Sequence, residues 1–116
     1  MKRLFFMGSS LADLREFPIE ARRVIGFALH LAQTGRKHVD AKPLKGFGGA
    51  SVLEVVASHD GNTFRSIYTV RFADAVYVLH AFQKKSKRGA ATPKQEIELV
   101  SRRLKQAEEH YAEWNR

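Results

Sequence analysis

A nearly unbroken apolar run, Val76 to Phe82, constrains the fold of this chain more than any other segment. Only His80 interrupts it with a polar side chain. A strand with one solvated face alternates apolar and polar residues, whereas a strand covered on both faces reads as a continuous apolar run. The run therefore predicts a central or doubly covered strand.

Two more strands are expected before this one. Residues 51–58 alternate so that Leu53, Val55 and Ala57 share a face. Asp60-Gly61 is a strong hairpin signal, and residues 63–72 form the next predicted strand. One side of that strand is expected to carry Arg65, Ile67, Thr69 and Arg71. A shorter apolar segment, residues 4–7, is predicted to be a further strand.

Three helices are expected around these strands. A short one begins at residue 10 and ends before Pro18, and a second starts at Pro18 and stops near Gly35. The wide apolar face of the second helix predicts burial against both the sheet and another helix. Gly26 lies in its middle, where glycine costs about 1 kcal/mol relative to alanine, so close packing is expected there. Thr92 and Gln95 have capping-box spacing and open the last helix. That helix carries an apolar stripe formed by Ile97, Val100, Leu104, Ala107, Tyr111 and Trp114.

The chain of 116 residues is therefore expected to form a single domain, residues 1–116, of the α+β class. We predict a small antiparallel meander of about four strands. Two N-terminal helices and a long C-terminal helix pack with this sheet, and two helices are expected to cover one face in a two-layer arrangement.

Composition narrows the possible partners. Lysine and arginine number 20 against 12 acidic residues, for a formal net charge of +8. Such an excess favours a nucleic acid or an acidic protein. Cysteine is absent, and no apolar stretch approaches the ~20 residues of a membrane span. We therefore expect a cytoplasmic protein with no membrane partner. The histidines lack metal-ligand spacing, so no metal and no cofactor are predicted.

The densest positive charge follows the apolar run and comprises Lys84, Lys85, Lys87 and Arg88. A solvated loop is one interpretation of this cluster, and an RNA phosphate backbone is the other. The preceding strand fixes where the cluster begins, which favours RNA. Arg65 could contact phosphate bidentately if it faces the same cleft. Tyr68 and Tyr77 could stack on a base or belong to the core.

Several segments of the chain resemble the RelE/HigB superfamily of toxins, in particular its phage-derived HigB-like branch. The segments that carry the resemblance are Phe17-Pro18, Gly26 with Ala28-Leu29, Lys42–Gly46, Val52–Val55, Phe64–Tyr68, Val78–Lys87 and Thr92–Ile97. Their order and spacing, more than any one of them, make the match specific.

This resemblance implies a RelE-like fold and a ribosome-dependent endonuclease that cleaves messenger RNA and inhibits translation. It also implies hetero-oligomers with a cognate helix-turn-helix antitoxin. By the same resemblance Arg65 stabilises the phosphate, and Lys84 and Lys85 are candidates for the general acid or base. Lys45, Arg71, Lys87 and Arg88 are expected to bind RNA. Relatives often end in a short tail with a catalytic tyrosine or histidine, whereas here a long helix follows, which leaves the acid–base pair open.

Two other functions are consistent with the same residues. One is a non-catalytic module that binds RNA or the ribosome. The other is an interaction protein whose basic face binds an acidic partner. Fold alone does not distinguish the three.

Overall fold

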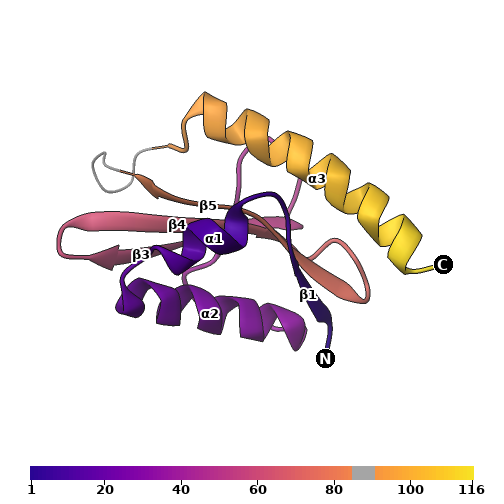
Figure 1. The fold of residues 1–116 in the computed structure, drawn as a ribbon, viewed down its shortest axis with the longest axis horizontal. Helices are drawn as coiled ribbons and strands as arrows, with labels where there is room; N and C mark the ends of the chain where they lie inside the picture. The colour runs from indigo at the N-terminus through magenta and orange to yellow at the C-terminus, as the bar shows by residue number, and fades with distance from the viewer. Residues whose placement is uncertain (85–90) are drawn as a thin grey trace.

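The computed structural model describes residues 1–84 and 91–116. Its helices are α1 (Ser10–Arg15), α2 (Ile19–Gln33) and α3 (Lys94–Trp114). Its strands are β1 (Arg3–Phe6), β2 (Lys42–Pro43), β3 (Val52–His59), β4 (Asn62–Thr69) and β5 (Ala75–Lys84). The α+β class and the long C-terminal helix of the sequence analysis are confirmed (Figure 1).

The sheet has five strands in the order β1-β5-β4-β3-β2. Strands β3, β4 and β5 form the expected antiparallel meander, but β1 pairs with β5 in parallel. The prediction of about four antiparallel strands is therefore wrong in detail. Parallel neighbours need a long connection, and residues 7–74, which contain α1, α2 and the strands β2, β3 and β4, connect β1 to β5. The additional strand is β2, where Lys42 pairs with Glu54 and Pro43 with Leu53, and no strand was predicted in this segment.

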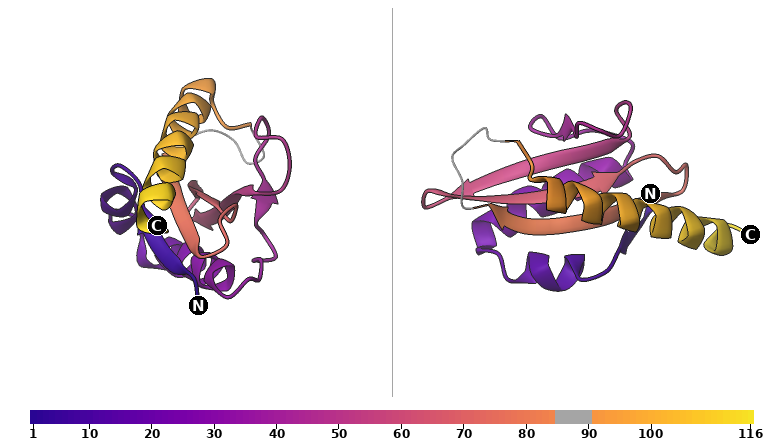
Figure 2. Two further views of the ribbon diagram at one scale, coloured as in Figure 1. Left: turned by 90° about the vertical axis from the view of Figure 1, so that its right-hand side faces the viewer. Right: turned by 90° about the horizontal axis from the view of Figure 1, so that it is seen from above.

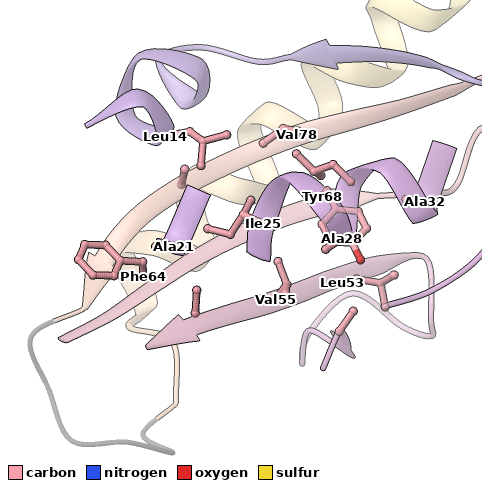
Figure 3. Packing of buried hydrophobic residues seen from close by; sticks show 14 of the residues in the cluster. Leu14, Ala21, Ile25, Ala28, Ala32, Leu53, Val55, Phe64, Tyr68 and Val78 are labelled. Carbon is pink, nitrogen blue, oxygen red and sulfur yellow. The ribbon is translucent and has the colours of Figure 1, made fainter. Parts of the chain in front are cut away.

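Helices cover both faces of the sheet, so the predicted two-layer arrangement is also wrong. Helices α1 and α2 lie on one side and α3 lies on the other, as Figure 2 shows. The core under α2 contains Ile25, Val55 and Tyr68 (Figure 3), whereas the core under α3 contains Ile67, Leu79 and Val100. Strand β5 contributes apolar side chains to both cores, which explains why its sequence does not alternate.

A β-bulge in β5 accounts for the position of His80. Ile67 of β4 pairs with His80, but the next residue, Tyr68, pairs with Val78. Leu79 is therefore an extra residue on β5. Leu79 packs in the core under α3, and His80 contacts Glu96 of α3, so two successive side chains point to the same layer.

The outer face of α2 differs from expectation. An added Cβ at Gly26 would meet no atom of the described residues within 4 Å, and Phe27 is 54% exposed. The predicted close packing at Gly26 and the second helix against this face are therefore wrong. The reason is that α3, which could have supplied that cover, lies on the opposite side of the sheet. The expected capping box is wrong too, because α3 has Pro93 at its N-cap and no side-chain capping bond.

Two glycine substitutions should change stability in opposite directions. Gly26→Ala should raise the free energy of unfolding by about 1 kcal/mol, because it adds helix propensity in open space. Gly8 has φ of +54°, and an added Cβ would lie 2.6 Å from the Arg103 side chain. Gly8→Ala should lower that free energy by about 1–2 kcal/mol. Urea denaturation measures both, and a stabilised Gly8→Ala variant would contradict this description.

Candidate functional site

Three charged side chains follow a diagonal across the sheet face that α3 covers. Arg65 of β4 pairs with Val56 of β3, so Glu54 is its diagonal neighbour two residues along. Arg65 also pairs with Phe82 of β5, so Lys84 is the diagonal neighbour on the other side. The register of the meander therefore brings Glu54, Arg65 and Lys84 together without help from any loop.

Glu54 connects two parts of this site. Arg65 Nη1 donates to Glu54 Oε1 at 2.9 Å, and Thr92 Oγ1 donates to Glu54 Oε2 at 2.8 Å. Arg65 is only 4% exposed. A buried ion pair of this kind holds both groups in place, because removing one partner leaves the other charged and desolvated. Thr92 adds a link from the β5–α3 connection to the same carboxylate.

Lys84 is the second cation of the site and is 7% exposed. Its ammonium group donates to the backbone oxygen of Ala91. Burial lowers the pKa of Lys84, the neighbouring charge of Arg65 lowers that pKa further, and Glu54 opposes both by raising it. A lysine whose pKa moves toward neutrality is better suited to exchange a proton at physiological pH.

A pocket of about 850 Å³ opens beside this charged row. Arg65, Glu54 and Thr92 line it, and Lys42 and Lys45 line it from the segment around β2. Apolar side chains contribute as well, among them Pro43, Leu44, Val56 and Ile97. Cations next to apolar walls can accept an anionic group and the flat surface of a base together. The pocket therefore brings predicted residues Arg65 and Lys45 into one site.

The other predicted residues do not all gather here. Arg71 lies beyond the end of β4, six residues from Arg65, and its Nη1 is 3.3 Å from Glu108 Oε1 of α3. Six residues of extended chain span about 20 Å, so the interpretation of Arg71 as part of the same RNA site is not supported by its position. Lys85, Lys87 and Arg88 lie outside the described residues.

The two tyrosines belong to the core. Tyr68 and Tyr77 are both fully buried, so stacking on a base, one of the two interpretations of the sequence, is wrong. Tyr68 lies under α2 (Figure 3), where burial raises its pKa to about 12. The hydroxyl of Tyr77 is 2.6 Å from His110 Nδ1 on α3.

Sequence reasoning missed a second polar cluster beneath α3. His80 Nε2 is 2.7 Å from Glu96 Oε2, and Arg103 Nη1 donates to the backbone oxygen of Leu79 at 3.0 Å. His80, Lys84 and Glu96 line a second pocket of about 710 Å³. Glu54 was missed as well, because nothing near it in the sequence indicates a partner for its carboxylate. The signal that could have found it is the hairpin register, which places Glu54 beside Arg65.

Neither a metal site nor a membrane span is found in residues 1–84 and 91–116. Within these ranges, no group of three or more histidine, aspartate or glutamate side chains is arranged to hold a metal ion. No described helix combines the length and the apolar character needed to cross a membrane.

Comparison with known proteins identifies one family. The family model described as phage-derived protein Gp49-like (DUF891) matches residues 12–105. That range contains the pocket cations Lys42, Lys45 and Arg65, the ion-pair partner Glu54 and the buried Lys84. No curated protein matches the chain, and no solved structure matches it.

The charge coupling within the site predicts pKa changes of opposite sign in two variants. Arg65→Ala should raise the pKa of Lys84, because Arg65 lowers it, and Glu54→Gln should lower that pKa further. NMR titration of ¹³C-labelled lysine measures both. In the parent chain, the free energy of unfolding should rise with pH between the lowered pKa and the ordinary lysine value, because the unfolded chain binds that proton more tightly. Shifts of the same sign in both variants would refute the arrangement.

Proposed function

We propose, because this chain belongs to the phage-derived Gp49-like family, that it is a RelE/HigB-type toxin of a type II toxin–antitoxin pair. In this proposal it cleaves messenger RNA on the ribosome and so inhibits translation. The single observation that carries the proposal is the buried Arg65–Glu54 pair in the wall of a pocket that Lys42 and Lys45 also line, since Arg65 is a fixed cation that a phosphate in the pocket could contact.

The chemistry requires charge stabilisation at phosphorus. The ribose 2′-oxygen attacks the adjacent phosphate, the bond to the 5′-oxygen breaks, and a 2′,3′-cyclic phosphate and a 5′-hydroxyl result. Negative charge builds on the phosphate oxygens in the transition state, and preorganised donors stabilise it. Arg65 Nη1 donates a hydrogen bond of 2.9 Å to Glu54 Oε1. This contact holds the guanidinium in place, and a donor that stabilises a transition state needs such a fixed position.

Two proton transfers accompany the attack. A base removes the proton of the 2′-hydroxyl, and an acid protonates the departing 5′-oxygen. We assign one of these roles to Lys84, because burial lowers its pKa and Arg65 is its diagonal neighbour on β4. Lys85 remains a candidate for the other role from the sequence resemblance. Lys45 and Lys42, on the rim of the pocket, are assigned to the flanking phosphates.

The proposal includes partners. A +8 chain is attracted to ribosomal RNA and messenger RNA through counterion release. Toxins of this type are held inactive by a cognate antitoxin, so we propose a toxin–antitoxin hetero-oligomer, with a helix-turn-helix antitoxin and a cytoplasmic site of action.

One observation favours a second function. Arg65 and Lys84 are buried, and both are engaged by described groups, Glu54 and Ala91. A structural ion-pair network has the same appearance, and perturbed pKa values occur in both settings. A non-catalytic RNA- or ribosome-binding module on the same fold is therefore the second candidate.

Replacement of Arg65 by lysine separates the two candidates. Arg65→Lys keeps the charge but loses the planar fork of donors. We expect ribosome affinity to stay within a fewfold and single-turnover cleavage of programmed ribosomes to fall by about 10²-fold or more, the size of one lost transition-state donor. Arg71→Lys is the control, because Arg71 lies beyond the end of β4 and outside the pocket, and it should cleave like the parent. Parental cleavage by Arg65→Lys would make Arg65 structural and favour the binding module.

Expression without a partner tests the activity itself. Induced production of the chain should halt protein synthesis before RNA synthesis, because the proposed target is translated messenger RNA. Pulse labelling measures both rates, and mapping of RNA 5′ ends should reveal new cuts within coding regions. Arg65→Ala, produced to the same level, is the control. Unchanged translation at high expression of the parent would refute the toxin assignment.

A further inference from the structure

The outward face of α2 is the most unusual surface among the described residues. Ile19, Arg23, Gly26 and His30 follow one another at helical spacing on the side away from the sheet, and Phe27 lies beside them. Ile19 is 49% exposed and Phe27 is 54% exposed. We call these five residues the α2 surface. In Figure 1, α2 lies on the outside of the molecule along its length.

Gly26 is unexplained by the fold. Glycine in a helix interior lowers helix stability, and here no backbone conformation requires it, because its φ is ordinary for a helix. Nothing among the described residues lies within 4 Å of its missing Cβ. A glycine without an internal reason instead permits another backbone to approach the helix closely.

Phe27 is exposed on the same helix, and a contact with His38 restricts its ring. Its ring meets the His38 ring edge-on, with the centroids 5.7 Å apart, and His38 is buried. The ring therefore has a fixed neighbour, although half of it faces solvent. A partner that covers the Phe27 ring buries apolar area. The entropy cost of fixing the Phe27 side chain is small, because the contact with His38 already restricts it.

Charge selects the kind of partner. Arg22 and Arg23 are exposed along this helix. The exposed acid near them, Glu20, lies 3.7 Å from His59 of β3. A second copy of the chain would place its own arginines opposite these arginines, and two chains that each carry a net charge of +8 repel one another. RNA would satisfy the arginines but would leave Ile19 and Phe27 without apolar cover. An acidic protein with an apolar stripe satisfies both.

We propose that the α2 surface docks an amphipathic helix of an acidic partner protein. The backbone of the partner helix crosses over Gly26, its apolar stripe covers Ile19 and Phe27, and its carboxylates face Arg23. This is the helix-on-helix form of ridge-and-groove packing, in which a small residue allows the closest approach. Because α2 and the Arg65–Glu54 pair lie on opposite faces of the sheet, docking is a separate property from the proposed cleavage.

The test uses a defined probe and the full chain. The probe is a helical peptide of about 20 residues with a leucine and alanine stripe flanked by glutamates, long enough to match α2. The control peptide has serine in place of each leucine and the same charge. We expect the first peptide to bind at least about tenfold more tightly than the control, with saturable NMR shifts of the amides in the α2 surface.

Three variants locate the contact. Arg23→Glu should weaken peptide binding by about tenfold or more, whereas Arg102→Glu, a matched exposed arginine on α3, should bind within about threefold of the parent. Gly26→Ala should weaken binding by at least about threefold, since its added methyl group separates the two backbones. The same substitution should stabilise the free chain, so a loss of binding there cannot come from loss of fold.

Several outcomes would overturn the inference. Equal affinity for both peptides would reduce the interaction to bulk charge. Shifts confined to the pocket around Lys45 and Arg65 would place the contact elsewhere. Tighter binding of an RNA oligonucleotide to the α2 surface, or a dimer of the chain that Phe27→Ser dissociates, would assign the surface to those occupants. None of these readouts involves cleavage, so docking and the proposed nuclease function succeed or fail independently.

Discussion

The double burial of β5 is the constraint on which the rest of the structure depends. This strand pairs with β1 on one edge and β4 on the other, and it supplies side chains to the cores on both faces. A strand in that position must have helices above and below it, because apolar area left in water would forfeit about 25 cal/mol per Å². Helix α3 therefore cannot join α1 and α2, and it brings Thr92 and Glu96 over the face that carries Arg65.

The charged row follows from that arrangement. Glu54, Arg65 and Lys84 occupy three neighbouring strands on the face beneath α3, so their separation is set by strand register and not by loop conformation. Burying two cations beside one carboxylate carries a desolvation cost, which appears as the lowered pKa of Lys84. Solubility does not explain why these two cations are buried, because exposed cations would serve solubility without the desolvation cost. The two buried cations are better explained by a need for fixed charge next to the pocket that Lys42 and Lys45 line.

Local patterns predicted most of the elements and little of their arrangement. The shared face of Leu53, Val55 and Ala57 and the turn at Asp60-Gly61 are confirmed, because alternation and turn chemistry are local. The parallel pairing of β1 with β5 depends on contacts between distant segments, and the meander pattern gave no sign of it. The bulge at Leu79 shifts His80 by one position, and a continuous apolar run cannot reveal such a shift. Arg65 was chosen from its strand and the resemblance, whereas its partner Glu54 needed the register.

The positive charge of this chain is divided between two physical environments, and the division bears on function. Arg65 and Lys84 are buried and oriented, whereas Lys42, Lys45, Arg22 and Arg23 are exposed. Exposed cations attract any polyanion over a Debye length, and salt screens that attraction. Arg65 adds little to long-range attraction, because Glu54 balances its charge at 2.9 Å, but its energy changes sharply when an anion arrives within contact distance. Selective stabilisation of a transition state needs the second kind, because charge that binds substrate and transition state equally accelerates nothing. Surface lysines would be sufficient for attraction alone, so a polyanion-binding surface does not explain why Arg65 is buried in the wall of the pocket and why Lys84 is buried next to Arg65.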